Sequence, residues 1–394
     1  MNLRHQSDLA PAALAKALRG REGLAFLDSS STRSGAISLV AAEPDLVLAG
    51  NDWGALAREL ERRQRTGPDL GYPDGAAIGW IAFDGSFRFS FYNTVHIFLH
   101  DDDRWANPPD VDVAPPKSGP ANIAFSPRIE KECYLQMVTK AQEYIAAGDI
   151  YQVCLAHPFV AETSVAAWDY YEKLRHFSPA PHAAFLDCGD LQMASASPEC
   201  FLRIGGKKIS TSPIKGTRPR RADSQTDQRN AYDLITSAKE IAELVMITDL
   251  ERNDLGQVCE FGSVTVPDLL RLERFEQVFH LVSTVEGHLR TDVSHVEAVR
   301  ACFPGGSISG APKKRALEII DELEPFPRGL YTGAIGYFGF NGESQFSISI
   351  RTAIFEKNTA HFHVGAGIVA DSVPEKEWDE TLDKASGLLL AAGG

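Results

Sequence analysis

Short apolar runs separated by tight-turn dipeptides recur through this chain, and they limit the fold more than any other feature. Gly205-Gly206 separates the runs 199–204 and 207–212, while Asn341-Gly342 and Lys357-Asn358 divide a strand-rich segment from about 331 to 369. Loops of this kind join neighbouring antiparallel strands. Helical patterns lie between these segments, so the sequence predicts an α+β fold in which helices pack on antiparallel sheets.

The hairpin at 199–212 places a lysine near a carboxylate. Its predicted register sets Glu199 opposite Ser212, and Pro213 and Gly216 then interrupt the second strand and leave Lys215 at the same end as Glu199. An amine and a carboxylate on one rigid element are typical of a nucleophile and its proton acceptor. From this geometry alone, an ordinary surface lysine beside a strand-end glutamate is the more common arrangement.

Three helices have recognisable ends. Ser126-Pro127 resembles an N-cap and first turn, and Gly148 a C-terminal stop. Capping boxes open two later helices, through Ser237 with Glu240 and through Ser372 with Glu375. A further helix is expected around 53–65, and strands at 24–27, 37–40, 46–49, 76–83, 87–91, 95–99, 183–187 and 191–196.

Two acidic pairs lie on the helices opened by these capping boxes. Glu240 and Glu243 are three residues apart, as are Glu377 and Glu380, so each pair shares a helix face. Carboxylate oxygens are the ligands that Mg²⁺ prefers. Solvated carboxylate faces are nevertheless common, and the second pair is predicted to lie away from its helix's apolar stripe. Metal binding is therefore one of two interpretations.

Other candidates bear on anion binding. The glycine-rich segment 303–312 enters a helix at Pro312, and such helix starts present N–H groups to an anion. Alternation over 346–351 puts Arg351 on the polar face, where it could clamp a carboxylate or simply face solvent. The 365–367 segment, with glycine at both ends, allows close backbone approach or relieves crowding in a strand. His280, taken alone, is typical of a structural histidine.

Composition narrows the function classes. The 394 residues carry a formal net charge of −14, which argues against nucleic acid or anionic membrane as the main partner. Neither an apolar run near the ~20 residues that span a bilayer nor a signal-like N-terminus is present. The six cysteines show no C-x-x-C spacing, so a cytoplasmic location is expected. Prolines and aspartates at 101–120 predict a linker between regions 1–120 and 121–394.

From about residue 122 to 390 the chain resembles the chorismate-utilising enzymes, in the branch that holds component I of anthranilate synthase and of aminodeoxychorismate synthase. The matching stretches occur in one order: GDIYQV (148–153), SPE (197–199), PIKGTRPR (213–220), KEIAE (239–243), LERNDLG (250–256), FEQVFH (275–280), FPGGSISGAPK (303–313), IRT (350–352), GAGIVADS (365–372) and EKEWDET (375–381). The resemblance implies antiparallel sheets packed face to face with helices outside, and a shortened N-terminal region.

Three positions distinguish between the branches of this family. Gln152 stands where isochorismate and salicylate synthases carry a water-activating lysine. Lys215 stands where anthranilate synthases have alanine, and Ser307 where they have threonine. The resemblance therefore favours the aminodeoxychorismate branch, in which chorismate and ammonia give 4-amino-4-deoxychorismate, a precursor of 4-aminobenzoate and folate. The alternatives are anthranilate synthase component I and a non-catalytic chorismate-fold binding protein.

The resemblance also implies roles for individual residues. Lys215 would be the nucleophile, Glu199 the general acid or base, and His280 an aid to proton transfer. Mg²⁺ would be held by Glu240, Glu243, Glu377 and Glu380. Substrate would be bound by Gln152, Gly216, Thr217, Ser307, Tyr331, Arg351, Gly365, Ala366, Gly367 and Lys384. A glutamine amidotransferase subunit would supply ammonia, and Lys215 would need a lowered pKa or a nearby base.

Overall fold

Two large antiparallel sheets form the body of the protein. The computed structural model describes residues 9–30, 35–67, 70–109, 119, 122–274 and 278–393. The order of strands in the first sheet is β17 (Gly310–Ala311), β9 (Gln152–Glu162), β21 (Thr359–Ile368), β20 (Thr352–Glu356), β11 (Leu191–Ser197), β10 (His182–Asp187), β1 (Ala25–Asp28), β2 (Ile37–Ala41), β6 (His96–Leu99) and β7 (Arg104–Trp105), with β8 (Ser126–Pro127) also paired to β9.

The second sheet has the order β14 (Ile214–Pro219), β16 (Val278–His288), β13 (Lys208–Ser212), β12 (Cys200–Gly205), β19 (Glu343–Ile348), β18 (Ala334–Gly339), β4 (Ala76–Ile81), β5 (Phe87–Tyr92) and β3 (Leu46–Gly50), with β15 (Thr265–Arg274) paired to β16. Strands from both sides of residue 120 pair in each sheet, for example β1 with β10 and β4 with β18. The boundary at residue 120 stays a prediction, and residues 110–118 and 120 of that linker lie outside the described residues.

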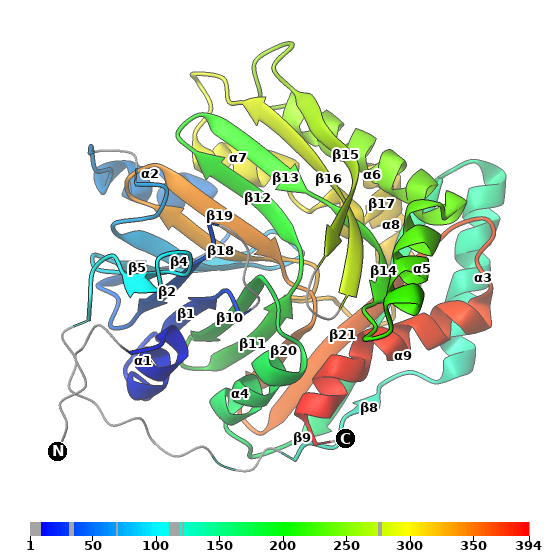
Figure 1. Ribbon diagram of the computed structural model, residues 1–394, viewed down its shortest axis with the longest axis horizontal. Helices are drawn as coiled ribbons and strands as arrows, with labels where there is room; N and C mark the ends of the chain where they lie inside the picture. Colours follow the sequence, from blue (N-terminus) through cyan, green and yellow to red (C-terminus); the bar gives the residue numbers. More distant parts are fainter. Residues whose placement is uncertain are drawn as a thin grey trace.

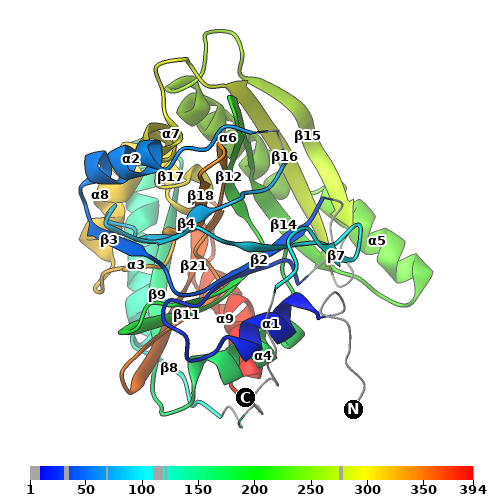
Figure 2. The same ribbon diagram turned by 90° about the vertical axis from the view of Figure 1, so that its left-hand side faces the viewer.

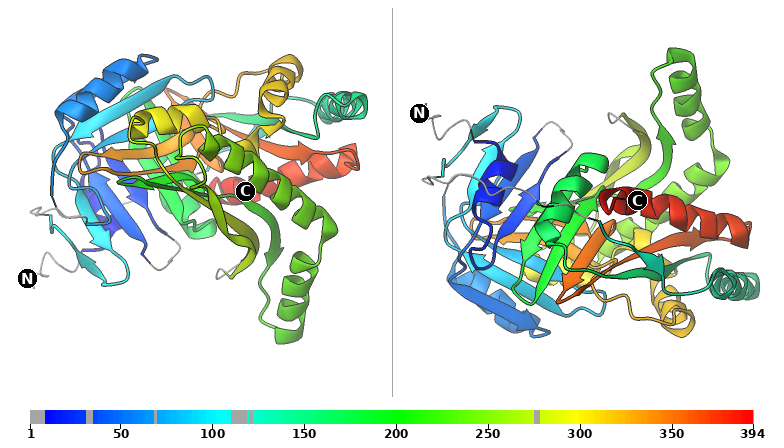
Figure 3. Two further views of the ribbon diagram at one scale, coloured as in Figure 1. Left: turned by 90° about the horizontal axis from the view of Figure 1, so that it is seen from above. Right: turned by 90° about the horizontal axis from the view of Figure 1, so that it is seen from below.

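The sheets face each other and helices cover their outer sides (Figures 1 and 2). Side chains of β1, β2, β4, β10 and β18 share one apolar core between the sheets. The helices are α1 (Pro11–Ala17), α2 (Trp53–Arg62), α3 (Lys131–Ala147), α4 (Ala167–Phe177), α5 (Ser224–Ile235), α6 (Ala238–Gly256), α7 (His295–Cys302), α8 (Lys313–Leu323) and α9 (Pro374–Ala391). Figure 3 shows α5 projecting from the body. The predicted α+β architecture is confirmed.

Outer cores fix the helices on the sheets. One joins α1, α4 and α9 to the first sheet, a second joins α2 and α7 to the second sheet, and a third packs α3 and α8 against β9 and β21. The described part of the chain contains no helix with the length and apolarity needed to cross a membrane.

The hairpin register differs from the prediction. Gly205 pairs with Lys208, so the loop is Gly206-Lys207, and Cys200 rather than Glu199 pairs with Ser212. The loop moves because Gly206 takes the positive φ, +55°, that a two-residue hairpin loop needs at its first position. A bulge between Cys200 and Arg203 adds one residue to β12. Glu199 therefore lies just before the strand.

Two predicted helix starts are wrong. Ser126-Pro127 forms β8 against β9, and α3 begins at Lys131, because strand pairing takes the place of the local cap. Ser372 accepts a hydrogen bond from the N–H of Val369 in a turn, and α9 begins at Pro374. Gly148 does end α3 in the left-handed region. The Ser237 cap is also present, since its hydroxyl accepts from the N–H of Glu240.

Candidate active site

Lys215 lies on β14, the edge strand that α5 and α6 approach. Its side chain is 17% exposed, and Nζ is 3.6 Å from Oε2 of Glu243 on α6. Gly216 follows at the point of closest approach, where a Cβ would lie 3.0 Å from Oε2 of Glu240. The strand therefore delivers a largely buried amine to the acidic face of α6.

Glu199 immediately precedes β12, next to Cys200, which pairs with Ser212 at the open end of the β12–β13 hairpin. Its side chain is buried, and the residue is 7% exposed. Burial raises the pKa of its carboxyl, although hydrogen bonds from the Ser307 hydroxyl and the Ile214 N–H, and the charge of Lys215, act in the opposite direction. Ser307 belongs to a 3-10 turn, Gly306–Ile308, in the glycine-rich segment. A buried carboxyl that favours its protonated form suits a general acid.

The charge state of Lys215 reflects several opposing neighbours. Burial alone lowers the pKa of its amine, but Cys154 and the carboxylates of Glu243, Glu199 and Glu380 outweigh burial and raise the pKa above its ordinary value. The sequence required either a lowered pKa or a nearby base. The pKa is raised in this structure, and the surrounding carboxylates are the available proton acceptors.

His280 fixes the backbone beyond Lys215. Its Nδ1 lies 3.1 Å from Oγ1 of Thr217 and 3.2 Å from the carbonyl oxygen of Gly216, and the ring is buried on β16. The pairing of β14 with β16 places Thr217 opposite His280. The histidine thus contacts two of the residues predicted to bind substrate.

The four glutamates come from two helices, α6 and α9. Oε1 of Glu243 and Oε2 of Glu377 are buried without a hydrogen-bond partner. Glu240 lies 3.6 Å from Arg218, and Glu380 pairs with Lys384 at 2.7 Å. Orphaned carboxylate oxygens of this kind fit a divalent cation that takes one or two protein carboxylates and completes its shell with water and substrate.

The position of Glu377 on α9 differs from the prediction, and the described residues contain no preformed metal cluster. Glu377 lies on the buried face of α9, 3% exposed, whereas the sequence put it away from the apolar stripe. Burial raises the pKa of its carboxyl, and nearby Glu380 adds to this. No three His, Cys, Asp or Glu side chains converge as a ready-made metal cluster within the described ranges. Metal binding by the four glutamates stays a prediction.

The 365–367 segment of β21 runs beside β9, which starts at Gln152. A Cβ on Gly367 would lie 2.8 Å from Nε2 of Gln152 and 3.7 Å from Nζ of Lys215. The carbonyl oxygen of Gly365 accepts a hydrogen bond from Lys384 at 2.9 Å. Ala366 buries its side chain in the α3–α8 core, so its backbone alone is available to a ligand.

Two further predicted substrate ligands flank this point. Arg351 has φ of +50°, and burial lowers the pKa of its guanidinium while the charge of Glu199 opposes that shift. The ring of Tyr331 stacks on His363 with centroids 5.3 Å apart. Burial raises the pKa of the Tyr331 hydroxyl, which therefore stays protonated and can donate a hydrogen bond.

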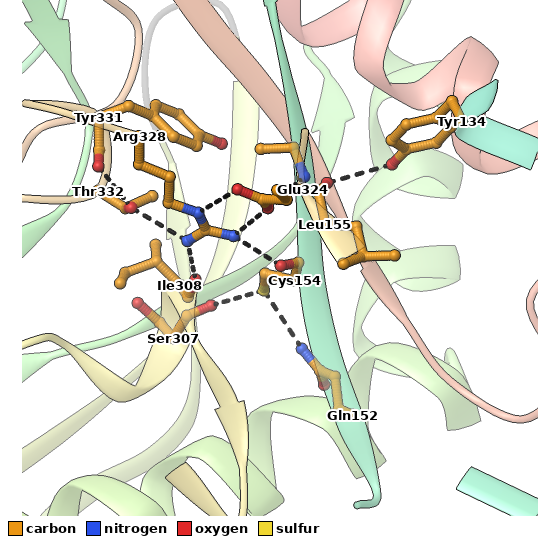
Figure 4. A network of polar contacts seen from close by, with 11 residues as sticks. Tyr134, Gln152, Cys154, Leu155, Ser307, Ile308, Glu324, Arg328, Tyr331 and Thr332 are labelled. Carbon is orange, nitrogen blue, oxygen red and sulfur yellow. Dashed lines mark hydrogen bonds and ion pairs between the residues drawn. The ribbon is translucent and has the colours of Figure 1, made fainter. Parts of the chain in front are cut away.

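A buried ion pair that the sequence did not reveal ties these segments together (Figure 4). Arg328 and Glu324 have side chains only 1% and 4% exposed and pair in two-pronged fashion at 2.6 and 2.9 Å. Arg328 also donates to the carbonyl oxygens of Ile308 and Cys154, at 3.2 and 2.7 Å. Glu324 accepts from the N–H of Ala156 at 2.8 Å. The only hint in the sequence is a four-residue spacing.

A cleft of about 1150 Å³ reaches the site from the surface. Among the predicted residues, Arg351, His280 and Lys384 line it, together with Pro198, Cys200 and Ser212, which flank Glu199 and the end of the hairpin. Lys215 and Glu199 themselves are not part of this lining. The cleft is therefore an approach to the site, since it is lined by residues that flank Glu199 and not by the reactive pair itself.

Comparison with known proteins identifies the family. Residues 81–390 match the family described as chorismate binding enzyme. The chain belongs to this family. It is 45% identical to anthranilate synthase component 1 of Thermus thermophilus over 68% of this chain and 58% of that protein, and 43% identical to anthranilate synthase component 1 of Pseudomonas aeruginosa over 68% and 54%. The chain thus matches little more than half the length of these relatives.

Solved structures agree with the fold. Anthranilate synthase component I from Streptococcus pneumoniae superposes with a TM-score of 0.81 at 28% identity, over 91% of this chain and 93% of that one. The menaquinone-specific isochorismate synthase of Escherichia coli, at 20% identity and a TM-score of 0.79 over 96% and 91%, shares the fold. These relatives include the anthranilate alternative, and none of those cited is an aminodeoxychorismate synthase.

Proposed function

We propose that this chorismate-binding enzyme aminates chorismate with ammonia to give 4-amino-4-deoxychorismate, with Lys215 as a covalent nucleophile. The observation that carries the proposal is the buried Lys215 amine, placed 3.6 Å from Glu243 and within the electrostatic reach of Glu199. The resemblance to the family's motifs also supports amination through Lys215, because anthranilate synthases have alanine at this position.

The residues present can supply and accept the protons that a double displacement requires. Lys215 gives a proton to a neighbouring carboxylate and its nitrogen bonds to C2; the ring electrons shift, the C4–O bond breaks, and Glu199 protonates the departing hydroxyl as water. Ammonia then bonds to C4, the electrons shift back and the C2–N bond breaks. The proton lost by the incoming ammonia restores Glu199, and the carboxylate that took the first proton returns it to Lys215.

The remaining residues bind and orient. Arg351 and the Tyr331 hydroxyl would hold a substrate carboxylate beside the bare backbone of 365–367. Glu243 and Glu377, with Glu240 and Glu380 nearby, would hold Mg²⁺, which supplies positive charge against a bound carboxylate. Ammonia would come from a separate glutamine amidotransferase subunit.

Anthranilate synthase component I is the second candidate. It is favoured by the two relatives named above, at 43–45% identity. That reaction also releases pyruvate. Incubation with chorismate, ammonium and Mg²⁺, followed by mass spectrometry of the products, distinguishes the two: we expect 4-amino-4-deoxychorismate without pyruvate, and anthranilate with pyruvate would replace the first proposal by the second.

The nucleophile has its own test. Intact-mass measurement of enzyme quenched with chorismate but without ammonia should show an adduct that Lys215→Ala abolishes and Lys215→Arg does not restore. Lys239→Ala is the matched control, because Lys239 also lies near Glu243, at 3.9 Å, but is 56% exposed. An adduct that survives in Lys215→Ala would refute the role of Lys215.

A further inference from the structure

The cleft that reaches the site has a charge opposite to that of the whole molecule. Its described lining carries five cationic side chains, Arg203, Arg271, Arg274, Arg351 and Lys384, and two carboxylates, Glu273 and Asp383. The chain as a whole carries a formal net charge of −14. Because an acidic protein repels an anion at long range, a locally cationic cleft provides a path along which an anion is attracted.

Not all of these cations are available. Arg271 pairs with Glu273 at 2.7 Å and with Asp268 at 3.6 Å, and Lys384 pairs with Glu380 at 2.7 Å. Arg351 is only partly exposed. Arg203 and Arg274 are both exposed, and neither forms an ion pair with any residue that the structure describes.

The second sheet holds both of these arginines in the lining of the cleft. Arg203 lies on β12 between Ser210 of β13 and Gln345 of β19, and both of these partners also line the cleft. Arg274 ends β15, with its guanidinium 5.7 Å from the ring centre of Phe279. Two arginines of the second sheet thus contribute positive charge to the lining of the cleft, which also includes Arg351 and Lys384.

We propose that Arg203 and Arg274 form an electrostatic entrance that guides the dicarboxylate substrate into the cleft. The inference rests on the proposed function, because chorismate carries two carboxylates whereas ammonia carries no negative charge. The two arginines act before the chemistry and touch none of the reacting atoms. They raise the rate of productive capture and leave the chemical step unchanged.

The size of the effect follows from Coulomb's law with screening. Reversing one arginine changes the local charge by two units against a doubly charged ligand. At a separation of about 10 Å in water, capture should fall about eightfold at 10 mM ionic strength and about twofold at 0.15 M. The effect is therefore recognisable by its dependence on salt.

The experiment compares Arg203→Glu, Arg274→Glu and Arg58→Glu, using kcat, KM for chorismate and KM for ammonium from 10 to 300 mM salt. Arg58 on α2 does not line the cleft, so its variant has the same net charge and serves as the control. We expect kcat/KM for chorismate to fall in the first two variants, most at low salt, while kcat and the KM for ammonium stay unchanged.

Equilibrium binding separates this inference from the proposed function. The dissociation constant of chorismate, measured by titration calorimetry, should show the same order of variants and the same salt dependence even if no amination is found, which would refute only the proposed function. Equal effects in all three variants, salt-independent losses, or no binding of chorismate by the unaltered protein would each overturn the entrance.

Discussion

Replacing Arg328 by methionine should destabilise the protein strongly, because Glu324 would be left as a buried carboxylate without its partner. Both side chains are almost fully buried and the pair is two-pronged. Removing one member of a buried pair costs about 3–5 kcal/mol in the free energy of unfolding. The carbonyls of Ile308 and Cys154 also lose a charged donor, which places the expectation at the upper end of that range.

The double variant Arg328→Met/Glu324→Leu tests this reasoning. An apolar replacement of a buried ion pair is often close to neutral, so most of the loss should return. About 1–3 kcal/mol should remain, because the N–H of Ala156 and the two carbonyls stay unpartnered. Urea unfolding of the three proteins measures these values. A single variant that loses less than about 1 kcal/mol, or a double variant no more stable than the single, would refute the account.

Activity should not follow stability in this series. The pair holds the Ser307 turn through Ile308, and β9 through Cys154 and Ala156, so the double variant should fold and yet keep a low kcat. Full recovery of kcat in the double variant would show that the pair contributes to stability alone. Arg328 and Glu324 are positioning residues in this view, since neither is proposed to touch the substrate.

Three further predictions concern single residues. Gly367→Ala should lower kcat at least about tenfold with little change in Tm, because its Cβ enters the space between Gln152 and Lys215 and only the end of a side chain must move; unchanged kcat would contradict this. Burial raises the pKa of Glu251 to about 8, above its unfolded value, so its contribution to stability is present below pH 4.5 and is lost as pH rises through 8. Glu251→Gln should therefore flatten the dependence of the unfolding free energy on pH between these two values. Curves of equal slope for the two proteins in that window would contradict this prediction. Burial lowers the pKa of His157 to about 4, so stability should fall as pH drops from 6.5 to 4, and His157→Phe should remove that part of the fall when followed by thermal unfolding at each pH.

The strands were predictable because their signals are local. Alternating runs placed β1 to β6 within a few residues, two turn dipeptides divided the segment that holds β18 to β21, and the left-handed Gly148 ended α3 as expected. The alternation over 346–351 was wrong at its end, because β19 stops at Ile348 and Arg351 takes a positive φ. The start of α3 was not predictable in this way. Ser126-Pro127 satisfies the local rules for a cap, but its partner Phe159–Val160 on β9 lies more than thirty residues away, and that pairing prevails.

The site was predictable in its residues and not in their arrangement. Motifs pointed to Lys215, Glu199 and the glutamates, but the bulge in β12, the burial of Glu377 and the Arg328–Glu324 pair all depend on contacts between distant segments. The bulge matters most for function. It leaves Glu199 outside the ladder, where its carboxyl accepts from Ser307 and the N–H of Ile214 rather than lying opposite Ser212 in a regular hairpin. The same carboxyl is then buried enough to keep a proton beside an amine that must lose one, and that pairing of an acid with a nucleophile is what the proposed double displacement requires.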